Sequence, residues 1–168
     1  MAIVFVAGLS AYWVLLRDGS ATAEVRVPEL ASRIGNGEDA VGVTASGKIV
    51  PGRAVPSDPP LPELSIGSVP EGGKLTDPAL AEAKVLGAAP KELRPYLERS
   101  HYDELGVDVV LTAGIELRFG DASRAQRKWA AAAALLADPS ISALSYINLY
   151  VPYRPSVWGS DYSLPPAQ

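Results

Sequence analysis

The last third of the chain carries two strand patterns with an alanine-rich helix pattern between them. Apolar and polar residues alternate over residues 115–119 and again over residues 146–151, which is the period of a strand with one buried face. Residues 121–137 are rich in alanine, the strongest helix former, and their apolar positions recur three and four residues apart until Asp138-Pro139. These elements can bury their apolar faces only against one another. The pattern therefore predicts helices packed on one face of a sheet.

Shorter patterns precede this unit. Residues 41–45 and 48–50 look like two strands around the turn Ser46-Gly47, and residues 101–105 and 107–112 look like two more. Thr76-Asp77-Pro78 is typical of a helix start. Strands that follow one another through short turns favour antiparallel pairing. The sequence thus predicts an α+β fold, a mostly antiparallel β-sheet with helices packed on one face.

The N-terminal sixteen residues carry no charge and are followed by Arg17-Asp18. As a helix they would rise about 24 Å, a little less than the ~30 Å hydrocarbon core of a bilayer. Tyr12 and Trp13 suit an interfacial aromatic belt. We expect residues 1–16 to form a single transmembrane or signal-anchor helix, with the bulk of the chain extracytoplasmic. A signal peptide cleaved at Ala21-Thr22-Ala23 and a buried core element are the alternatives.

The remaining residues divide by composition. Residues 17–40 are polar and contain the turn signal Gly35-Asn36-Gly37, so we expect a linker there. Residues 41–157 hold the strand and helix patterns and should form one β-domain. Residues 158–168 are expected to be a flexible C-terminal tail.

Composition and motifs exclude several functions. The chain has no cysteine, which excludes disulfide bonds and cysteine-ligated metal sites. Its net charge is −4, and it has no basic patch of the size that a nucleic-acid binder needs. His101 is the single histidine, so any triad or imidazole metal site would need it. Asp103-Glu104 and Glu116 could be called a carboxylate pair, but a solvated strand face is the simpler interpretation. We expect no enzyme, no cofactor, no metal site, no nucleic-acid partner and no small-molecule substrate.

The C-terminal region is unusually aromatic. Five of the twelve aromatic residues fall within seventeen positions. Amphipathic aromatic side chains are common anchors in protein interfaces. Alternatively, some of them pack back on the domain, with a disordered tail beyond. The five are Tyr146, Tyr150, Tyr153, Trp158 and Tyr162.

Several motifs occur in an order that points to a family. GIELRFGD precedes KWAAAAALLAD, which precedes SYINLYVPYRPSV, and KLTDPALAEAKVLGAAP stands upstream of them. This order resembles the β-domain of the bacterial cell-division family FtsQ (DivIB in some bacteria). The resemblance covers residues 41–157, with Asn148 where the family often has Asp and Tyr150 where Arg is usual. The family's POTRA domain has no counterpart between residues 16 and 41, so we expect either that this domain is missing or that the chain is a divergent or truncated relative.

The resemblance implies a non-catalytic scaffold that is anchored in the cell membrane by one N-terminal segment. Such proteins bind FtsB and FtsL outside the cytoplasm and help control septal wall synthesis. In the family a partner adds a strand to the last β-strand, by β-augmentation. Carried over, that strand is residues 146–151, and Pro152 and Pro155 would mark its end. The partner-binding residues would be Tyr146, Ile147, Asn148, Leu149, Tyr150, Val151, Tyr153 and Trp158.

Overall fold

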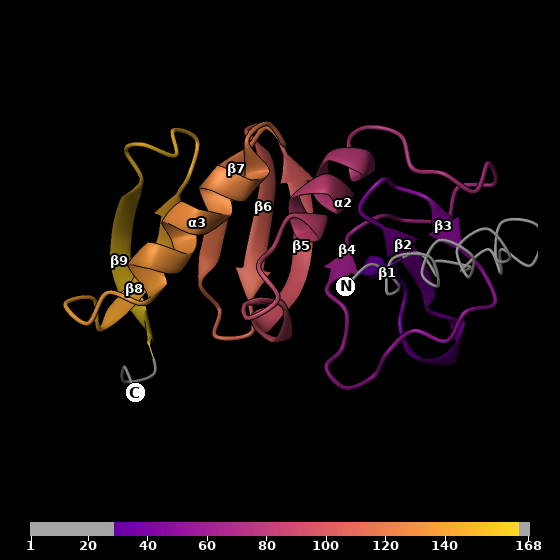
Figure 1. The fold of residues 1–168 in the computed structure, drawn as a ribbon, viewed down its shortest axis with the longest axis horizontal. Helices are drawn as coiled ribbons and strands as arrows, with labels where there is room; N and C mark the ends of the chain where they lie inside the picture. The colour runs from indigo at the N-terminus through magenta and orange to yellow at the C-terminus, as the bar shows by residue number, and fades with distance from the viewer. Residues whose placement is uncertain (1–28, 165–168) are drawn as a thin grey trace, which may run out of the picture.

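The computed structural model describes residues 29–164 as an α+β fold with one mixed nine-stranded sheet and two α-helices (Figure 1). The strands are β1 (Leu30–Ile34), β2 (Val41–Thr44), β3 (Ile49–Val50), β4 (Glu63–Leu64), β5 (Leu97–Asp103), β6 (Gly106–Leu111), β7 (Glu116–Gly120), β8 (Ala143–Asn148) and β9 (Ser156–Ser163). The helices are α2 (Ala79–Gly87) and α3 (Ala125–Leu136), with 3-10 turns η1 (Gly37–Asp39) and η2 (Arg94–Tyr96).

The predicted anchor at residues 1–16 lies outside the described residues. Within residues 29–164, no helix has the length and apolar character needed to cross a membrane.

The sheet order is β3-β2-β1-β4-β5-β6-β7-β8-β9. Five of the neighbouring pairs are antiparallel, whereas β1–β4, β4–β5 and β7–β8 are parallel. The α+β class is confirmed, but "mostly antiparallel" was too simple a description of a mixed sheet. For β4–β5 and β7–β8 the reason lies in the connections, because α2 and α3 each carry the chain back along the sheet before the next strand begins.

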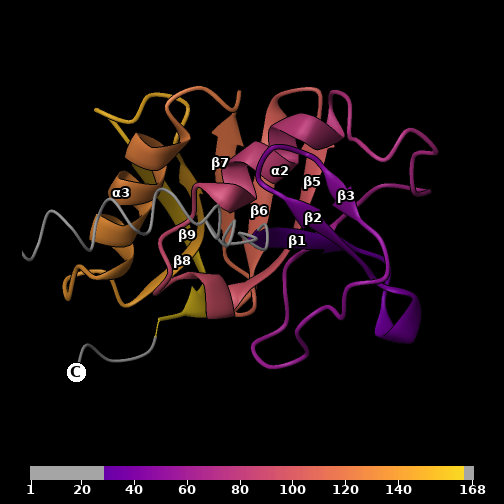
Figure 2. The same cartoon turned by 45° about the vertical axis from the view of Figure 1, so that its right-hand side comes forward.

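Both helices lie on the same face of the sheet (Figures 1 and 2). The core between them and the strands centres on Trp129 of α3, which is fully buried. Its ring packs on Phe119 of β7 with centroids 4.8 Å apart, and its Nε1 donates a hydrogen bond of 2.8 Å to the Val85 carbonyl of α2. One side chain thus joins both helices to the sheet.

The same face holds a buried charge, the ammonium of Lys128 in α3. This side chain is 1% exposed. Its ammonium donates to the carbonyls of Phe119 and Asp121, at 2.8 and 2.9 Å, and to Asp121 Oδ1 at 2.8 Å. The ammonium therefore holds the end of β7 and the turn before α3 together, and these hydrogen bonds compensate for its burial. Together with Ser123, this ammonium lowers the pKa of Asp121 to about 2.

Two predicted boundaries were wrong. The segment expected to be a linker contains β1, which pairs with β2 from Leu30 to Ile34 and contributes buried side chains to the core. The segment expected to be a tail contains most of β9. Both strands have too few regularly spaced apolar residues to stand out by composition, and pairing with neighbours decides their structure.

We predict that Asp121→Asn lowers the thermal unfolding temperature, because Lys128 then keeps its buried charge without a carboxylate. A carboxyl whose folded pKa is depressed contributes stability above its unfolded pKa of 3.8, and that stability disappears as pH falls toward about 2. The difference between variant and wild type should therefore shrink over this range. Thermal unfolding followed by circular dichroism against pH measures it. A difference that stays constant from pH 5 to pH 2 would contradict the role of the ion pair.

Candidate partner-binding site

The strand predicted as the docking edge is an interior strand. β8 pairs in parallel with β7 on one side and antiparallel with β9 on the other, with Tyr146 opposite Trp158 and Ile147 opposite Val157. Both backbone edges of residues 146–148 are therefore occupied. The prediction that residues 146–151 offer a free edge was wrong. The edge of the sheet belongs to β9, one strand further along (Figure 1).

The prolines serve the turn that leads into β9. The Asn148 side chain accepts a hydrogen bond of 3.0 Å from the Tyr150 backbone amide, which ends β8 in an Asx turn. A second turn follows, in which the Arg154 amide donates to the Val151 carbonyl. Pro152 is buried in this turn, and Pro155 directly precedes β9. The prolines mark the reversal of the chain and not the end of a docking strand.

β9 is the long open edge among the described strands. All eight residues, Ser156–Ser163, are exposed, and Trp158 is exposed to 69%. The opposite edge of the sheet, β3, has only two residues, and the Ile49 amide there donates to the Gly73 carbonyl. The C-terminal edge therefore offers far more unpaired backbone than the N-terminal one.

A bulge shapes this edge. The register shifts between Leu144 and Tyr146, where β9 carries extra residues around Gly159. Gly159 has a φ of +81°, and a Cβ there would lie 1.8 Å from Ser145 Oγ, so this position needs glycine. Ser145 Oγ donates to Asp161 Oδ2 at 2.5 Å and fixes the bulged segment. The bulge thus divides the edge into two stretches: residues 156–158 before it, called the outer stretch, and residues 162–163 after it, called the inner stretch.

The predicted site residues do not form one continuous surface. Ile147 and Leu149 are fully buried in the core and cannot contact a partner. Tyr146 lies beneath the Arg118 guanidinium, 3.8 Å from its ring centroid. Val151 is half exposed and lies in the turn after β8.

Tyr150, Asn148 and Tyr153 lie near the turn that joins β8 to β9. Tyr150 lies over Gly120, where an added Cβ would meet its ring at 2.9 Å, and Asn148 forms the Asx turn. Tyr153 is exposed and hydrogen-bonded to Arg127 of α3. Of the predicted residues, Trp158 alone belongs to the open strand.

Sequence reasoning missed most of β9. Val157 and Tyr162 are exposed hydrophobic residues on this strand, with Ser156 and Ser163 at its ends. The one available signal was Val157-Trp158, two good strand formers that follow Pro155 after one serine. Gly159 and Asp161 interrupt the alternation, so the pattern resembles a loop.

The sheet face without helices carries a polar cluster beside β8. His101 of β5, Asp108 of β6 and Glu116 of β7 point to this side, and Arg118 donates to Glu116 Oε2 from Nη2 at 2.8 Å and from Nε at 3.0 Å. Burial raises the pKa of Asp108 to about 7, with a further contribution from Glu116, whereas Arg118 opposes the rise. An aspartate carboxyl that keeps its proton up to about pH 7 is unusual on a strand of this kind.

We predict that Asp108→Asn stabilises the protein at alkaline pH. The folded chain holds the Asp108 proton up to about pH 7, and the unfolded chain releases it near 3.8, so wild-type stability falls between these values. Asparagine has the same shape and no charge to desolvate. Unfolding temperatures in metal-free buffer should therefore differ above pH 7 and converge toward pH 4. An equal difference at both ends of this range would show that titration of Asp108 is not the cause.

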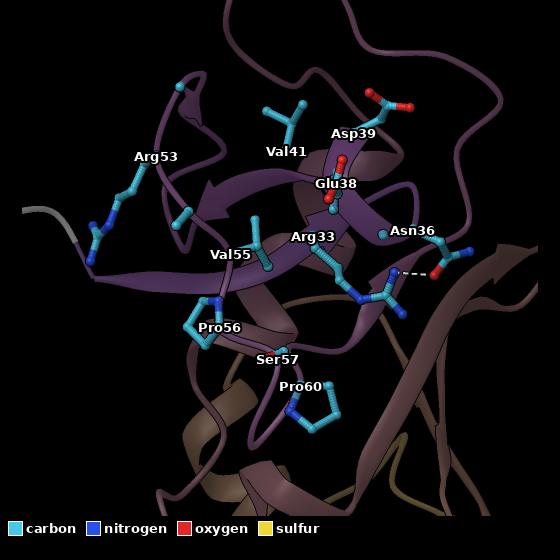
Figure 3. A pocket seen from close by; sticks show the side chains of 14 residues that line it. Arg33, Asn36, Glu38, Asp39, Val41, Arg53, Val55, Pro56, Ser57 and Pro60 are labelled. Atoms are coloured by element: carbon cyan, nitrogen blue, oxygen red, sulfur yellow. Dashed lines mark hydrogen bonds between the residues drawn. The ribbon is translucent and has the colours of Figure 1, made fainter.

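A hollow also opens at the other end of the sheet, between η1 and the loop at residues 52–60 (Figure 3). Arg33 of β1 points across it toward Asn36. Its Nε donates to the Leu61 carbonyl at 2.9 Å, and its Nη2 lies 3.5 Å from Glu63. The guanidinium therefore ties β1 to β4 and the loop before it, which is a structural role.

No protein-family model matches the chain, and no curated protein matches it.

Proposed function

We propose that this chain is a non-catalytic scaffold of the bacterial cell-division machinery, anchored in the membrane by residues 1–16. It binds FtsB- and FtsL-like partners outside the cytoplasm and helps control septal wall synthesis. The partner adds a strand to the last strand of the sheet, which is β9. The open edge of β9 is the observation that carries this proposal.

An exposed edge strand of this length favours strand addition. Its unpaired amides and carbonyls provide main-chain hydrogen bonds for an incoming strand, and alternate side chains provide specificity. Such an edge is a liability in a protein without a partner, because it also templates aggregation. β9 lacks the lysines and prolines that usually protect an edge, and its one protective feature is the bulge at Gly159. An obligatory partner would explain why so little protection is present.

The side chains along the edge suit a protein partner. Trp158 and Val157 expose apolar surface on the outer stretch, and Tyr162 exposes part of its ring beyond the bulge. Tyr153 adds a fourth exposed hydrophobic side chain in the preceding turn. Aromatic residues of this kind are enriched among the residues that dominate binding energies. We therefore place the strongest contacts at residues 156–158.

We predict that Trp158→Ala weakens binding of an FtsB/FtsL-like complex by about tenfold or more, as for an aromatic anchor. The matched control is Tyr96→Ala, which removes an aromatic ring of comparable exposure outside the edge strand. Calorimetric titration of the detergent-solubilised full chain measures both variants. Equal affinities for the two variants would exclude Trp158 from the interface.

The backbone contribution can be tested with single prolines at Ser156, Val157 and Trp158. Neighbouring residues in a strand direct their amides alternately toward β8 and toward the open side. A proline at an outward position removes a docking donor, so it should weaken partner binding with little loss of thermal stability. A proline at an inward position should lower the unfolding temperature instead. Full binding by every variant that remains folded would overturn strand addition.

The membrane part of the proposal rests on residues 1–16 and is tested separately. An anchored chain should remain in the membrane fraction with its N-terminus intact. The alternative is a secreted or periplasmic binding module, favoured by the small residues Ala21-Thr22-Ala23. The mass of the mature N-terminus distinguishes the two. A chain that begins at residue 24 would contradict the anchor and leave the binding edge unaffected.

A further inference from the structure

Three potential metal ligands meet on the sheet face without helices. His101 and Asp108 are direct cross-strand partners on β5 and β6, and Glu116 follows on β7. One ligand atom from each lies within 4.8 Å of the others. The three side chains come from adjacent strands of a rigid sheet, so their relative positions are fixed by backbone pairing and not by loops.

The distances from the imidazole to the two carboxylates are too long for direct hydrogen bonds. His101 Nε2 lies 3.9 Å from Asp108 Oδ2 and 3.9 Å from Glu116 Oε1. Around a tetrahedral metal with bonds of about 2.0–2.2 Å, neighbouring ligand atoms are about 3.3–3.6 Å apart. The two distances from His101 Nε2 exceed this spacing by a few tenths of an ångström, and the two carboxylate ligand atoms lie within 4.8 Å of each other. The gap between them therefore fits one ion.

The Asp108 carboxyl is buried and faces the other two side chains. The residue is 4% exposed, its Oδ2 lies 3.9 Å from His101 Nε2, and it shares a side-chain hydrogen bond with Glu116. No lysine or arginine of residues 29–164 forms an ion pair with it. A buried carboxylate is costly unless a cation compensates it, and a bound metal ion would supply that charge.

The Glu116 carboxylate is oriented by a neighbouring guanidinium. Arg118 directs Nε and Nη2 to a single oxygen of Glu116, Oε2, and leaves Oε1 on the side of His101. Arg118 in turn stacks on Tyr146, which fixes its position. Outer residues that orient ligands in this way are usual around metal ions. His101 has no such support, because its Nδ1 is buried without a hydrogen-bond partner, but its Nε2 faces the two carboxylates.

We propose that His101, Asp108 and Glu116 bind one zinc ion on this face of the sheet. One imidazole nitrogen and two carboxylate oxygens form a ligand set that zinc accepts, with water at the remaining position. Calcium and magnesium prefer ligand sets made of oxygen alone. Bound zinc would connect β5, β6 and β7 directly and stabilise the folded chain by mass action.

The test is a calorimetric titration of zinc chloride into the metal-free full chain in detergent micelles at neutral pH. We expect one zinc per chain and a higher unfolding temperature with zinc. His101→Gln, Asp108→Asn and Glu116→Gln should each weaken binding by at least about tenfold. Glu98→Gln is the matched control, because it removes an exposed carboxylate from the same strand as His101 and should bind like wild type.

Each outcome decides the proposal. A wild-type chain that binds no zinc overturns it, and so does zinc binding that Asp108→Asn leaves unchanged. Asp108→Asn removes a charge while keeping the side-chain shape, so a folded variant is expected even if the other two are less stable. Cobalt substitution provides a second measurement. Visible absorption bands of four-coordinate cobalt should appear with wild type and Glu98→Gln and be absent with Asp108→Asn.

Discussion

The position of α3 on the sheet determines which strand lies at the C-terminal edge. Trp129 packs on Phe119 of β7 and donates a hydrogen bond to the Val85 carbonyl of α2, so it holds α3 against the strand that precedes it and against the other helix. Replacing a fully buried tryptophan with alanine typically costs about 3–5 kcal/mol. With α3 held there, the chain returns to the start of β7, and β8 must pair with β7 in parallel. The turn after Asn148 then brings β9 to the outer edge.

This order of strands gives the C-terminal half of the sheet three distinct surfaces: a face covered by helices, an open face and an edge. The helix face is apolar and carries one buried ammonium, that of Lys128, which is fully hydrogen-bonded. The opposite face carries the buried carboxylate of Asp108 and the Arg118–Glu116 pair. The edge carries β9 with Trp158. A partner strand at the edge and a zinc ion on the open face would therefore occupy different parts of one sheet.

The sequence was sufficient for elements with strong periodicity and insufficient for those defined by their neighbours. Residues 115–119 and the alanine-rich helix were predicted because alternation and helix propensity act locally. β1 and β9 were missed because their stability comes from pairing with β2 and β8. The docking edge was placed one strand too early for the same reason. Alternation shows which face of a strand is buried and says nothing of how many neighbours it has.

The candidate cluster shows the same limit. His101, Asp103 and Glu116 look like solvated polar residues in the sequence, and Asp108 stands between valines. Register alone brings His101 opposite Asp108, and a strand shifted by one residue would place them on opposite faces. No spacing rule along the chain links residues on three strands.

Amide hydrogen exchange across residues 143–163 tests the account most directly. In the free chain, amides of residues 146–148 should all be protected, because both edges of β8 are paired there. Amides of β9 should be protected only at alternate positions of its paired stretches. Addition of the FtsB/FtsL-like complex should then protect the remaining amides at residues 156–158. Rapid exchange throughout β9 in the free chain, with protection of only alternate amides in β8, would contradict the account and restore β8 as the edge.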